Sequence, residues 1–205
     1  MQYKTGVCTF CGTGCGNFLK VSGGRIEGTF PSQGHPIGQG RLCVRGWNLH
    51  ELLRSGDRIL EPRIRRHGVL QPTSLAEALE WMAARVHRLR KSGDEIAVLG
   101  SPRSSNEEQY LLLRLSRAAL KTSNISLDSE GGHRKSLDIL SRGAGFPGMT
   151  GSIEEIRQSD LILLVDYDAT IQNPIVGSEI HFAAREGRRV VTIDGRRTRM
   201  ARLST

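Results

Sequence analysis

The sequence predicts an α/β protein in which a small N-terminal lobe with a β-hairpin precedes a Rossmann-like domain built on a parallel sheet. Two observations support this prediction. All four cysteines fall within the first 43 residues, which marks the N-terminal region as a lobe organised around a site. From residue 74 onward, short apolar runs alternate with segments of helical periodicity, which is typical of a parallel sheet with helices on its faces.

The composition is that of a globular chain and argues against several functional classes. The 205 residues are 38% hydrophobic and 24% charged, and no apolar run is long enough to cross a membrane. The formal net charge is +8, but only 5% of the residues are aromatic, so base-stacking platforms are not expected. The first residues, Met1-Gln2-Tyr3-Lys4, lack the features of an export signal. We therefore expect a cytoplasmic protein without membrane insertion or nucleic-acid binding.

The cysteines Cys8, Cys11, Cys15 and Cys43 predict a metal site rather than disulfides, because the chain shows no secretory signal. Structural zinc usually takes two C-x2-C pairs, whereas three closely spaced thiolates and a distant fourth suit a cubane iron–sulfur cluster. The glycines that lie among the first three cysteines allow tight turns that direct amide N–H groups at sulfur. The spacing favours a [4Fe-4S] cluster, with a glycine-rich zinc loop as the alternative.

The rest of the lobe is expected to support this site. Strand-like segments at 17–21 and 25–30 flank Ser22-Gly23-Gly24, a turn sequence that predicts a β-hairpin. A short helical pattern follows Cys43, from Trp47 to Leu53. We expect a cluster lobe over residues 1–60, a linker with a short strand over 61–73, and the α/β domain over 74–205.

The larger domain shows alternating helix and strand signals. Ser74-x-x-Glu77 and Ser152-x-x-Glu155 are capping-box patterns that mark helix starts. Longer helices are expected over 75–89, 107–121, 133–140 and 176–186, and strands over 95–100, 124–125, 161–165 and 189–194. Ligands of parallel sheets bind beyond the carboxyl ends of the strands, so the loops after these strands are candidate binding segments.

Four stretches of the sequence resemble a known family. "VCTFCGTGCGNFLKVSGGRIEG" and "GRLCVRGWNLHELLRSGDRILEPRIR" are similar to the N-terminal [4Fe-4S] domain of the molybdopterin oxidoreductases, especially formate dehydrogenase catalytic subunits and the large iron–sulfur subunit of respiratory complex I. "GSPRSSNEEQYLLLRLSRAALKTSNI" and "NPIVGSEIHFAAREGRRVVTIDGRRT" extend the resemblance over essentially the whole chain. Members that carry a pterin are several times longer, so the resemblance implies a truncated member.

The resemblance also locates three pterin-binding elements on this sequence, two of which have changed. The metal-binding Cys or selenocysteine of formate dehydrogenases aligns with Gly132, followed by His133, with Glu130 where an Arg is common. A Gly-x-Asn-Pro type loop aligns with Asp166-Tyr167-Asp168-Ala169, whose carboxylates would repel a pyrophosphate. The third element survives as Asp194-Gly195-Arg196-Arg197-Thr198, in which the Asp contacts guanine in relatives and the arginines equally suit a solvated surface. We therefore expect no catalytic residue and no molybdopterin guanine dinucleotide.

Arg45 is a further position that the resemblance singles out. Formate dehydrogenases usually carry a Lys here, between the cluster and the pterin, so the resemblance implies a cation beside the cluster. A positive charge at this place stabilises the reduced, more negative cluster and raises its reduction potential.

Three functional hypotheses follow from these features. The first is a non-catalytic electron-transfer subunit of a larger redox complex, whose partner is a flavoprotein, a ferredoxin-like subunit, a hydrogenase or heterodisulfide-reductase-type module, or a formate-oxidising chain. The second is the N-terminal piece of a split molybdenum or tungsten formate dehydrogenase, with another chain completing the pterin site. The third is a zinc-containing nucleic-acid module, suggested by the basic stretches at 63–67 and 85–91; without interleaved aromatics these stretches better fit a solvated surface.

Overall fold

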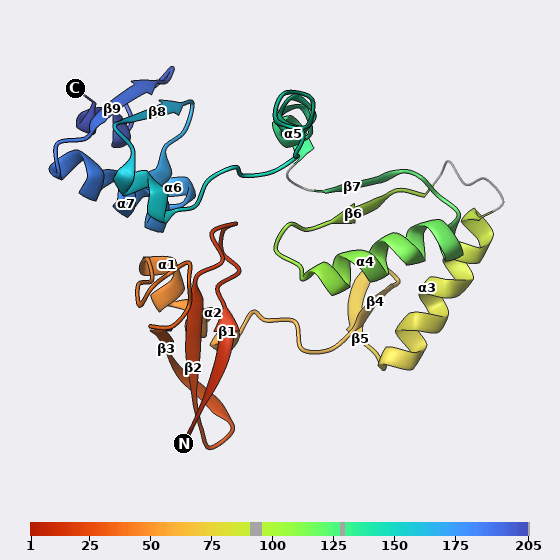
Figure 1. The fold of residues 1–205 in the computed structure, drawn as a ribbon. Coiled ribbons are helices and arrows are strands. Elements are labelled where there is room, and N and C mark those ends of the chain that lie inside the picture. The colour runs from red at the N-terminus through yellow and green to blue at the C-terminus, as the bar shows by residue number, and fades with distance from the viewer. Residues whose placement is uncertain (91–95, 128–129, 205) are drawn as a thin grey trace. The chain divides into compact units, whose positions relative to one another are not determined.

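The computed structural model describes residues 1–90, 96–127 and 130–204, which belong to two compact units (Figure 1). The first unit combines Met1–Arg54 with Asp138–Thr205, and the second unit spans Ser55–Leu137. The chain thus leaves the first unit after the N-terminal lobe and returns to it at Asp138.

The N-terminal lobe is a three-stranded antiparallel sheet of β1 (Gln2–Val7), β2 (Gly16–Ser22) and β3 (Arg25–Pro31), in that order. The β2–β3 hairpin is confirmed, with Gly23 and Gly24 at positive φ in its turn. The sequence does not predict β1, because its side chains lack apolar alternation and lie largely exposed. Its conformation comes from pairing with β2 along its whole length, which places the first three cysteines in the connection between the two strands.

Two short helices follow Cys43, as the sequence predicts: α1 (Val44–Trp47) and α2 (Leu49–Arg54). The backbone N–H of His50 in α2 donates to the hydroxyl of Thr29 at 3.1 Å, and Thr29 is a buried residue of β3. The Trp47 ring meets Phe30 of β3 edge to face at 6.4 Å. These contacts fix the segment around Cys43 against the sheet.

The described residues of the second unit form one antiparallel hairpin, one pair of parallel strands and several helices. In chain order they are β4 (Arg63–Arg66), β5 (Val69–Pro72), α3 (Leu75–Leu89), β6 (Val98–Gly100), α4 (Asn106–Arg114), the π-helical turn η2 (Leu115–Leu120), β7 (Ile125–Leu127) and α5 (Glu130–Ala144), which continues into the first unit. The stretch expected to be a linker with a short strand therefore contains two paired strands. Helix α5 extends beyond the predicted 133–140 at both ends.

Helix α3 begins where its capping signal predicts, but only half of the capping box forms. The N–H of Glu77 donates to the Ser74 hydroxyl at 3.2 Å. The Glu77 carboxylate turns to Thr73 and Arg66 instead of returning to the Ser74 N–H. The basic hairpin β4–β5 thus competes for the carboxylate that the local sequence pattern assigns to the helix start.

The C-terminal part of the first unit is built on two parallel strands, β8 (Leu161–Val165) and β9 (Arg189–Ile193). The remaining elements are η3 (Glu154–Gln158), α6 (Ala169–Gln172), α7 (Pro174–Arg185) and η4 (Met200–Leu203). The core beneath the strands consists of Leu164, Ala169, Ile180, Val190 and Met200, all buried. The alternate apolar residues of the same strands are exposed on the opposite face: Leu161, Leu163, Val165, Val191 and Ile193.

The parallel pairs confirm the α/β class. The described strands form two separate parallel pairs, β6–β7 in the second unit and β8–β9 in the first, where the sequence predicts one sheet. None of the described helices is both long and apolar enough to cross a bilayer.

Candidate metal centre

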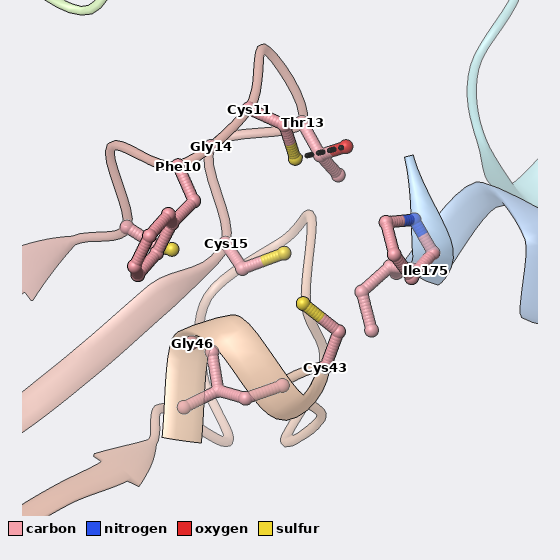
Figure 2. A pocket seen from close by; sticks show the side chains of 11 residues that line it. Phe10, Cys11, Thr13, Gly14, Cys15, Cys43, Gly46 and Ile175 are labelled. Carbon is pink, nitrogen blue, oxygen red and sulfur yellow. Dashed lines mark hydrogen bonds between the residues drawn. The ribbon is translucent and has the colours of Figure 1, made fainter. Parts of the chain in front are cut away.

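The four cysteines line a single cavity of the first unit. Cys8, Cys11 and Cys15 come from the β1–β2 connection, which we call the cysteine loop, and Cys43 precedes α1. Figure 2 shows the side chains of Cys11, Cys15 and Cys43 pointing toward one space. The structure therefore brings together thiols that lie far apart in the sequence.

The local fold of the cysteine loop follows from the strands that carry it. The N–H of Cys8 donates to the carbonyl of Cys15 at 2.8 Å, which extends the β1–β2 ladder and closes the loop at its base. Gly14 has φ +69°, so the tight turn predicted from the glycines is present. A Cβ at Gly38 would lie 2.9 Å from the Arg41 carbonyl oxygen and 3.5 Å from Cys15 Cβ, so only glycine fits this approach to the cysteine loop.

The thiols differ in their exposure and in their acidity. Cys8 and Cys15 are 7% and 6% exposed, whereas Cys11 and Cys43 are partly exposed. Burial, and then the charges of the other three cysteines, raises the pKa of Cys15 to about 11. Burial also raises the pKa of Cys8, although a backbone hydrogen bond near Phe10 and the charge of Arg45 oppose the increase. Four thiolates in this cavity therefore repel one another unless a cationic group joins them.

A chain of polar contacts connects the cysteine loop to the start of α7. Cys11 Sγ lies 3.4 Å from Thr13 Oγ1, which accepts a hydrogen bond from Asn173 Nδ2 at 2.9 Å. The Tyr167 hydroxyl donates to Asn173 Oδ1 at 2.8 Å. Burial, with a smaller contribution from Cys11, raises the pKa of Tyr167, so its phenol stays protonated. Sequence reasoning missed these three residues, because an Asn-Pro helix start carries no sign of a contact 160 residues away.

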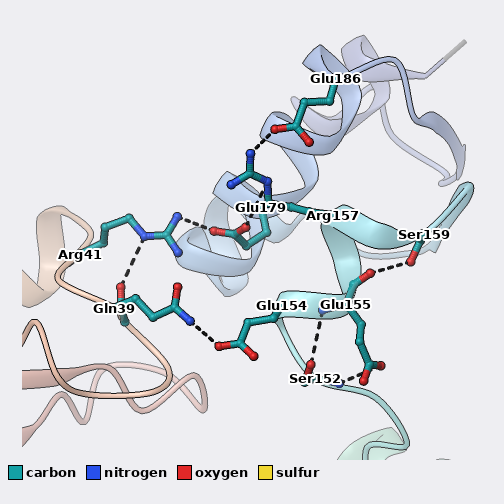
Figure 3. Close-up of polar contacts among 10 residues, drawn as sticks. Gln39, Arg41, Ser152, Glu154, Glu155, Arg157, Ser159, Glu179 and Glu186 are labelled. Atoms are coloured by element: carbon teal, nitrogen blue, oxygen red, sulfur yellow. Dashed lines mark hydrogen bonds and ion pairs between the residues drawn. The ribbon is translucent and has the colours of Figure 1, made fainter.

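A second set of contacts holds the segment before Cys43 against α7 and η3 (Figure 3). Arg41 forms an ion pair with Glu179, a residue of α7 that is only 4% exposed. Arg157 lies 4.0 Å from the same carboxylate, and Gln39 hydrogen-bonds Glu154. The sequence contains no signal for these pairs. They attach the lobe that bears the cysteines to the C-terminal part of the first unit.

Arg45 lies on α1, directly after Cys43 and Val44. Its Nη2 donates to the carbonyl oxygen of Gln172, at the end of α6, at 3.3 Å. Its positive charge is close enough to lower the pKa of Cys8. The prediction of a cation beside the cysteines is thus compatible with the geometry, and its role toward a bound cluster stays a prediction.

The loop after β8, which the resemblance associates with pterin binding, has a different organisation. Asp166 adopts φ +47°, the left-handed region that favours glycine, which is the residue that the resemblance places at this position. Asp168 is 5% exposed and caps α6, accepting hydrogen bonds from the N–H and the hydroxyl of Thr170. The sequence predicts that both carboxylates face a ligand. For Asp168 this prediction is wrong, because its carboxylate is buried and bonded to Thr170 within the protein.

The resemblance also associates the Gly132–His133 pair and Asp194 with pterin binding, and the structure describes the side chain of Asp194 alone among them. Gly132 and His133 lie in the first turn of α5, and their side chains lie outside the described part of the chain. The Asp194 side chain is 2% exposed; its Oδ1 accepts from the Arg196 N–H at 2.8 Å. Its Oδ2 is buried without a hydrogen-bond partner among the described residues. That oxygen retains an unfilled capacity to accept a hydrogen bond.

The donor chemistry of the cysteine cavity fits a cluster of several irons. Among the described residues, no three His, Cys, Asp or Glu side chains converge closely enough to share a single metal ion. A cubane does not require such convergence, since each thiolate binds a different iron. Four thiols on an antiparallel lobe, joined to parallel β-strands and helices, define an α/β protein with a thiol-lined cavity.

Comparison with known proteins identifies the family. Residues 1–55 match the molybdopterin oxidoreductase Fe4S4 domain and residues 58–204 match the molybdopterin oxidoreductase domain, so the chain belongs to the molybdopterin oxidoreductase family. It is 35% identical over its whole length to the F420-dependent formate dehydrogenase subunit alpha of Methanocaldococcus jannaschii, and 30% identical to formate dehydrogenase H of Escherichia coli. It spans 30% of the length of each relative.

A solved structure confirms the fold at low sequence identity. Acetylene hydratase from Pelobacter acetylenicus superposes on 98% of this chain with a TM-score of 0.74 at 19% identity, and the match covers 28% of that enzyme. The family resemblance and the α/β class predicted from the sequence are therefore both confirmed.

Proposed function

We propose that the chain holds one [4Fe-4S] cluster on Cys8, Cys11, Cys15 and Cys43 and passes single electrons between redox partners. The observation that carries this proposal is that four thiols from two separate segments line one cavity, inside the region that matches the family's Fe4S4 domain. When bound, such a cluster supplies a one-electron redox couple.

The four cysteines differ in their exposure to solvent, and the proposal assigns a different role to the buried pair and to the partly exposed pair. Cys8 and Cys15 lie on the buried side of the cavity, where low polarity protects thiolate–iron bonds from water. Cys11 and Cys43 lie on the partly exposed side, next to Val44, which is 74% exposed. This side supports electron exchange with a partner, because a partner can approach it closely. Arg45 adds a positive charge that favours the reduced state.

Iron and sulfide analysis of anaerobically purified protein tests the proposal. We expect about four iron and four sulfide ions per chain, a brown colour, and reversible one-electron reduction. A colourless protein with one zinc ion per chain would instead support the zinc alternative, and the electron-transfer proposal would then be abandoned.

We further propose that the chain works in contact with other redox polypeptides. Several relatives are named alpha subunits of F420-dependent formate dehydrogenases, and the outward apolar face of β8–β9 supports a contact with further protein. Candidate partners are the flavoprotein, ferredoxin-like, hydrogenase, heterodisulfide-reductase-type and formate-oxidising chains that the sequence suggests. Native co-purification followed by anaerobic electron transfer tests this role. We expect transfer to slow when Arg45→Glu is introduced and when salt screens the charges.

We also propose that this chain does not bind molybdopterin guanine dinucleotide by itself. Gly132 offers no metal ligand, and Asp166 places a carboxylate side chain at the backbone position where relatives have glycine. Mass spectrometry of protein purified without a large partner decides the question, and detection of the pterin would overturn the proposal.

A second candidate function is supported by one observation. The unpaired, buried Oδ2 of Asp194 can accept a hydrogen bond from an N–H group of a nucleotide base, as expected for the N-terminal piece of a split formate dehydrogenase. Molybdenum or tungsten in the purified complex, together with formate oxidation, would favour this candidate over the electron-transfer subunit.

A further inference from the structure

Three hydrogen-bonding side chains form one continuous path that ends at a cysteine sulfur. Tyr167 follows β8, Asn173 precedes α7, and Thr13 belongs to the cysteine loop. The path runs from the Tyr167 hydroxyl to Asn173 Oδ1 at 2.8 Å, from Asn173 Nδ2 to Thr13 Oγ1 at 2.9 Å, and from Thr13 Oγ1 to Cys11 Sγ at 3.4 Å. Tyr167, Asn173 and Thr13 are all partly buried, which limits competition from water.

The chemistry of the groups fixes the direction of the path. The protonated phenol of Tyr167 donates to an amide oxygen, which can only accept, so the Asn173 amide presents its NH2 group to Thr13. Because that NH2 group can only donate, the Thr13 oxygen accepts from it and the Thr13 hydroxyl hydrogen is left to point elsewhere. A free Cys11 thiol can donate to Thr13, but a thiolate bound to iron has no proton and can only accept. With iron bound to Cys11, the Thr13 hydroxyl would therefore be the donor and Cys11 Sγ the acceptor of this contact.

We propose that Thr13, Asn173 and Tyr167 form a positioning chain that holds one hydrogen bond on the Cys11 sulfur and so raises the reduction potential of the cluster. The inference rests on the proposed function, because it requires a cluster on the four cysteines. Reduction adds a negative charge that is shared by the cluster sulfurs, and a hydroxyl donor stabilises the reduced state more than the oxidised state. Asn173 and Tyr167 act through Thr13, by fixing the direction of its hydroxyl.

The chain also couples the centre to the loop after β8. Tyr167 stands between Asp166 and Asp168, in the segment that the family associates with pterin binding, and its ring packs against the core beneath β8. A change in this loop that withdraws the Tyr167 hydroxyl frees the Asn173 amide to turn. The Thr13 hydroxyl then acquires an amide oxygen as a competing acceptor, and its bond to Cys11 weakens.

The experiment is a redox titration of the anaerobic, cluster-loaded protein, monitored by visible absorbance and by electron paramagnetic resonance. Thr13→Val removes the hydroxyl with little change of shape, Thr13→Ser keeps it, and Tyr167→Phe removes only the far end of the chain. Thr9→Val is the matched control, since Thr9 lies in the same loop, is exposed, and makes no side-chain hydrogen bond to the described residues.

We expect Thr13→Val to lower the midpoint potential. At the wild-type midpoint its ratio of reduced to oxidised cluster should fall about fivefold, which is the size of the net contribution of one ordinary hydrogen bond. Tyr167→Phe should lower the potential less, and Thr13→Ser and Thr9→Val should leave it unchanged. If Thr13→Val fails to retain iron, the midpoint potential of Tyr167→Phe alone tests the proposal, because this substitution alters no residue of the cysteine loop.

Two results would overturn the inference. One is an unchanged potential in a Thr13→Val or Tyr167→Phe protein that retains all its iron, which would mean that the contacts only tie the segments together. The other is an equal shift in Thr9→Val, which would mean that any change in the loop has this effect. A wild-type protein that assembles no iron–sulfur cluster would instead contradict the proposed function, so the two failures are distinguishable.

Discussion

The cysteine loop and the loop after β8 both follow strands of the first unit, and the sequence resemblance associates both with cofactor binding. The cysteine loop brings its three thiols to a cavity that Cys43 also lines, and Gly14 in this loop has the positive φ that the tight turn requires. The loop after β8 has a glycine-like backbone conformation at Asp166, and its Asp168 carboxylate accepts a hydrogen bond at the start of α6. The side chains of the cysteine loop thus converge on a cavity, whereas the Asp168 side chain of the second loop is engaged within the protein.

The largest effect on iron content and stability is expected from substitution of Cys43, the cysteine that lies outside the cysteine loop. Cys43→Ala should abolish iron binding and lower the free energy of unfolding by about 4 kcal/mol or more, because a lobe with so small a core depends on its metal. Iron analysis and denaturant unfolding under anaerobic conditions measure both quantities. Val44→Ala, at the neighbouring exposed position, is the control and should change neither. Full iron content in Cys43→Ala would show that Cys43 is not a ligand.

The next effect concerns the ion pair that joins the cysteine-bearing lobe to α7. Glu179→Ala should cost about 2 kcal/mol of stability, less than for a fully buried pair because Arg41 is one-third exposed. A double-mutant cycle with Arg41→Ala isolates the coupling between the two residues. Glu154→Ala removes a carboxylate from an exposed contact nearby and should cost no more than about 1 kcal/mol. Equal losses for Glu179→Ala and Glu154→Ala would contradict the importance of burial.

A smaller effect is expected in the loop after β8. Asp168→Ala removes the cap of α6 and should lower the free energy of unfolding by about 1 kcal/mol, whereas Asp168→Asn keeps a capping oxygen and should cost less. Iron content should stay at the wild-type level in both variants. Loss of iron in Asp168→Asn would show that iron binding depends on the carboxylate charge of Asp168 and not on its capping hydrogen bond.

The smallest expected effect is an increase in the free energy of unfolding when Asp166 is replaced by glycine. Asp166→Gly relieves a left-handed backbone conformation and should raise the free energy of unfolding by about 0.5–1 kcal/mol, although glycine also increases the entropy of the unfolded chain. Thermal unfolding of the loaded protein measures the change. Asp166→Ala, which removes the charge but keeps a Cβ at φ +47°, should show no such gain. A stabilised Asp166→Ala would attribute the effect to charge rather than to backbone strain.

The sequence by itself predicts the features that depend on near neighbours. The Gly23-Gly24 turn, the strand at 161–165 and the reciprocal Ser152–Glu155 cap all appear as predicted, because turn geometry and capping are completed within a few residues. The four cysteines stand out for another reason: their residue type and uneven spacing mark a metal site before any fold is known.

The tertiary structure decides everything that joins distant segments. It forms β1 from a sequence without strand periodicity, because pairing with β2 supplies the hydrogen bonds. It diverts the Glu77 carboxylate to Arg66, and it buries Asp168 as a helix cap where the family resemblance suggests a charge facing a ligand. It also brings Asn173 against Thr13. Such contacts depend on the path of the whole chain, and local propensity contains no information about that path.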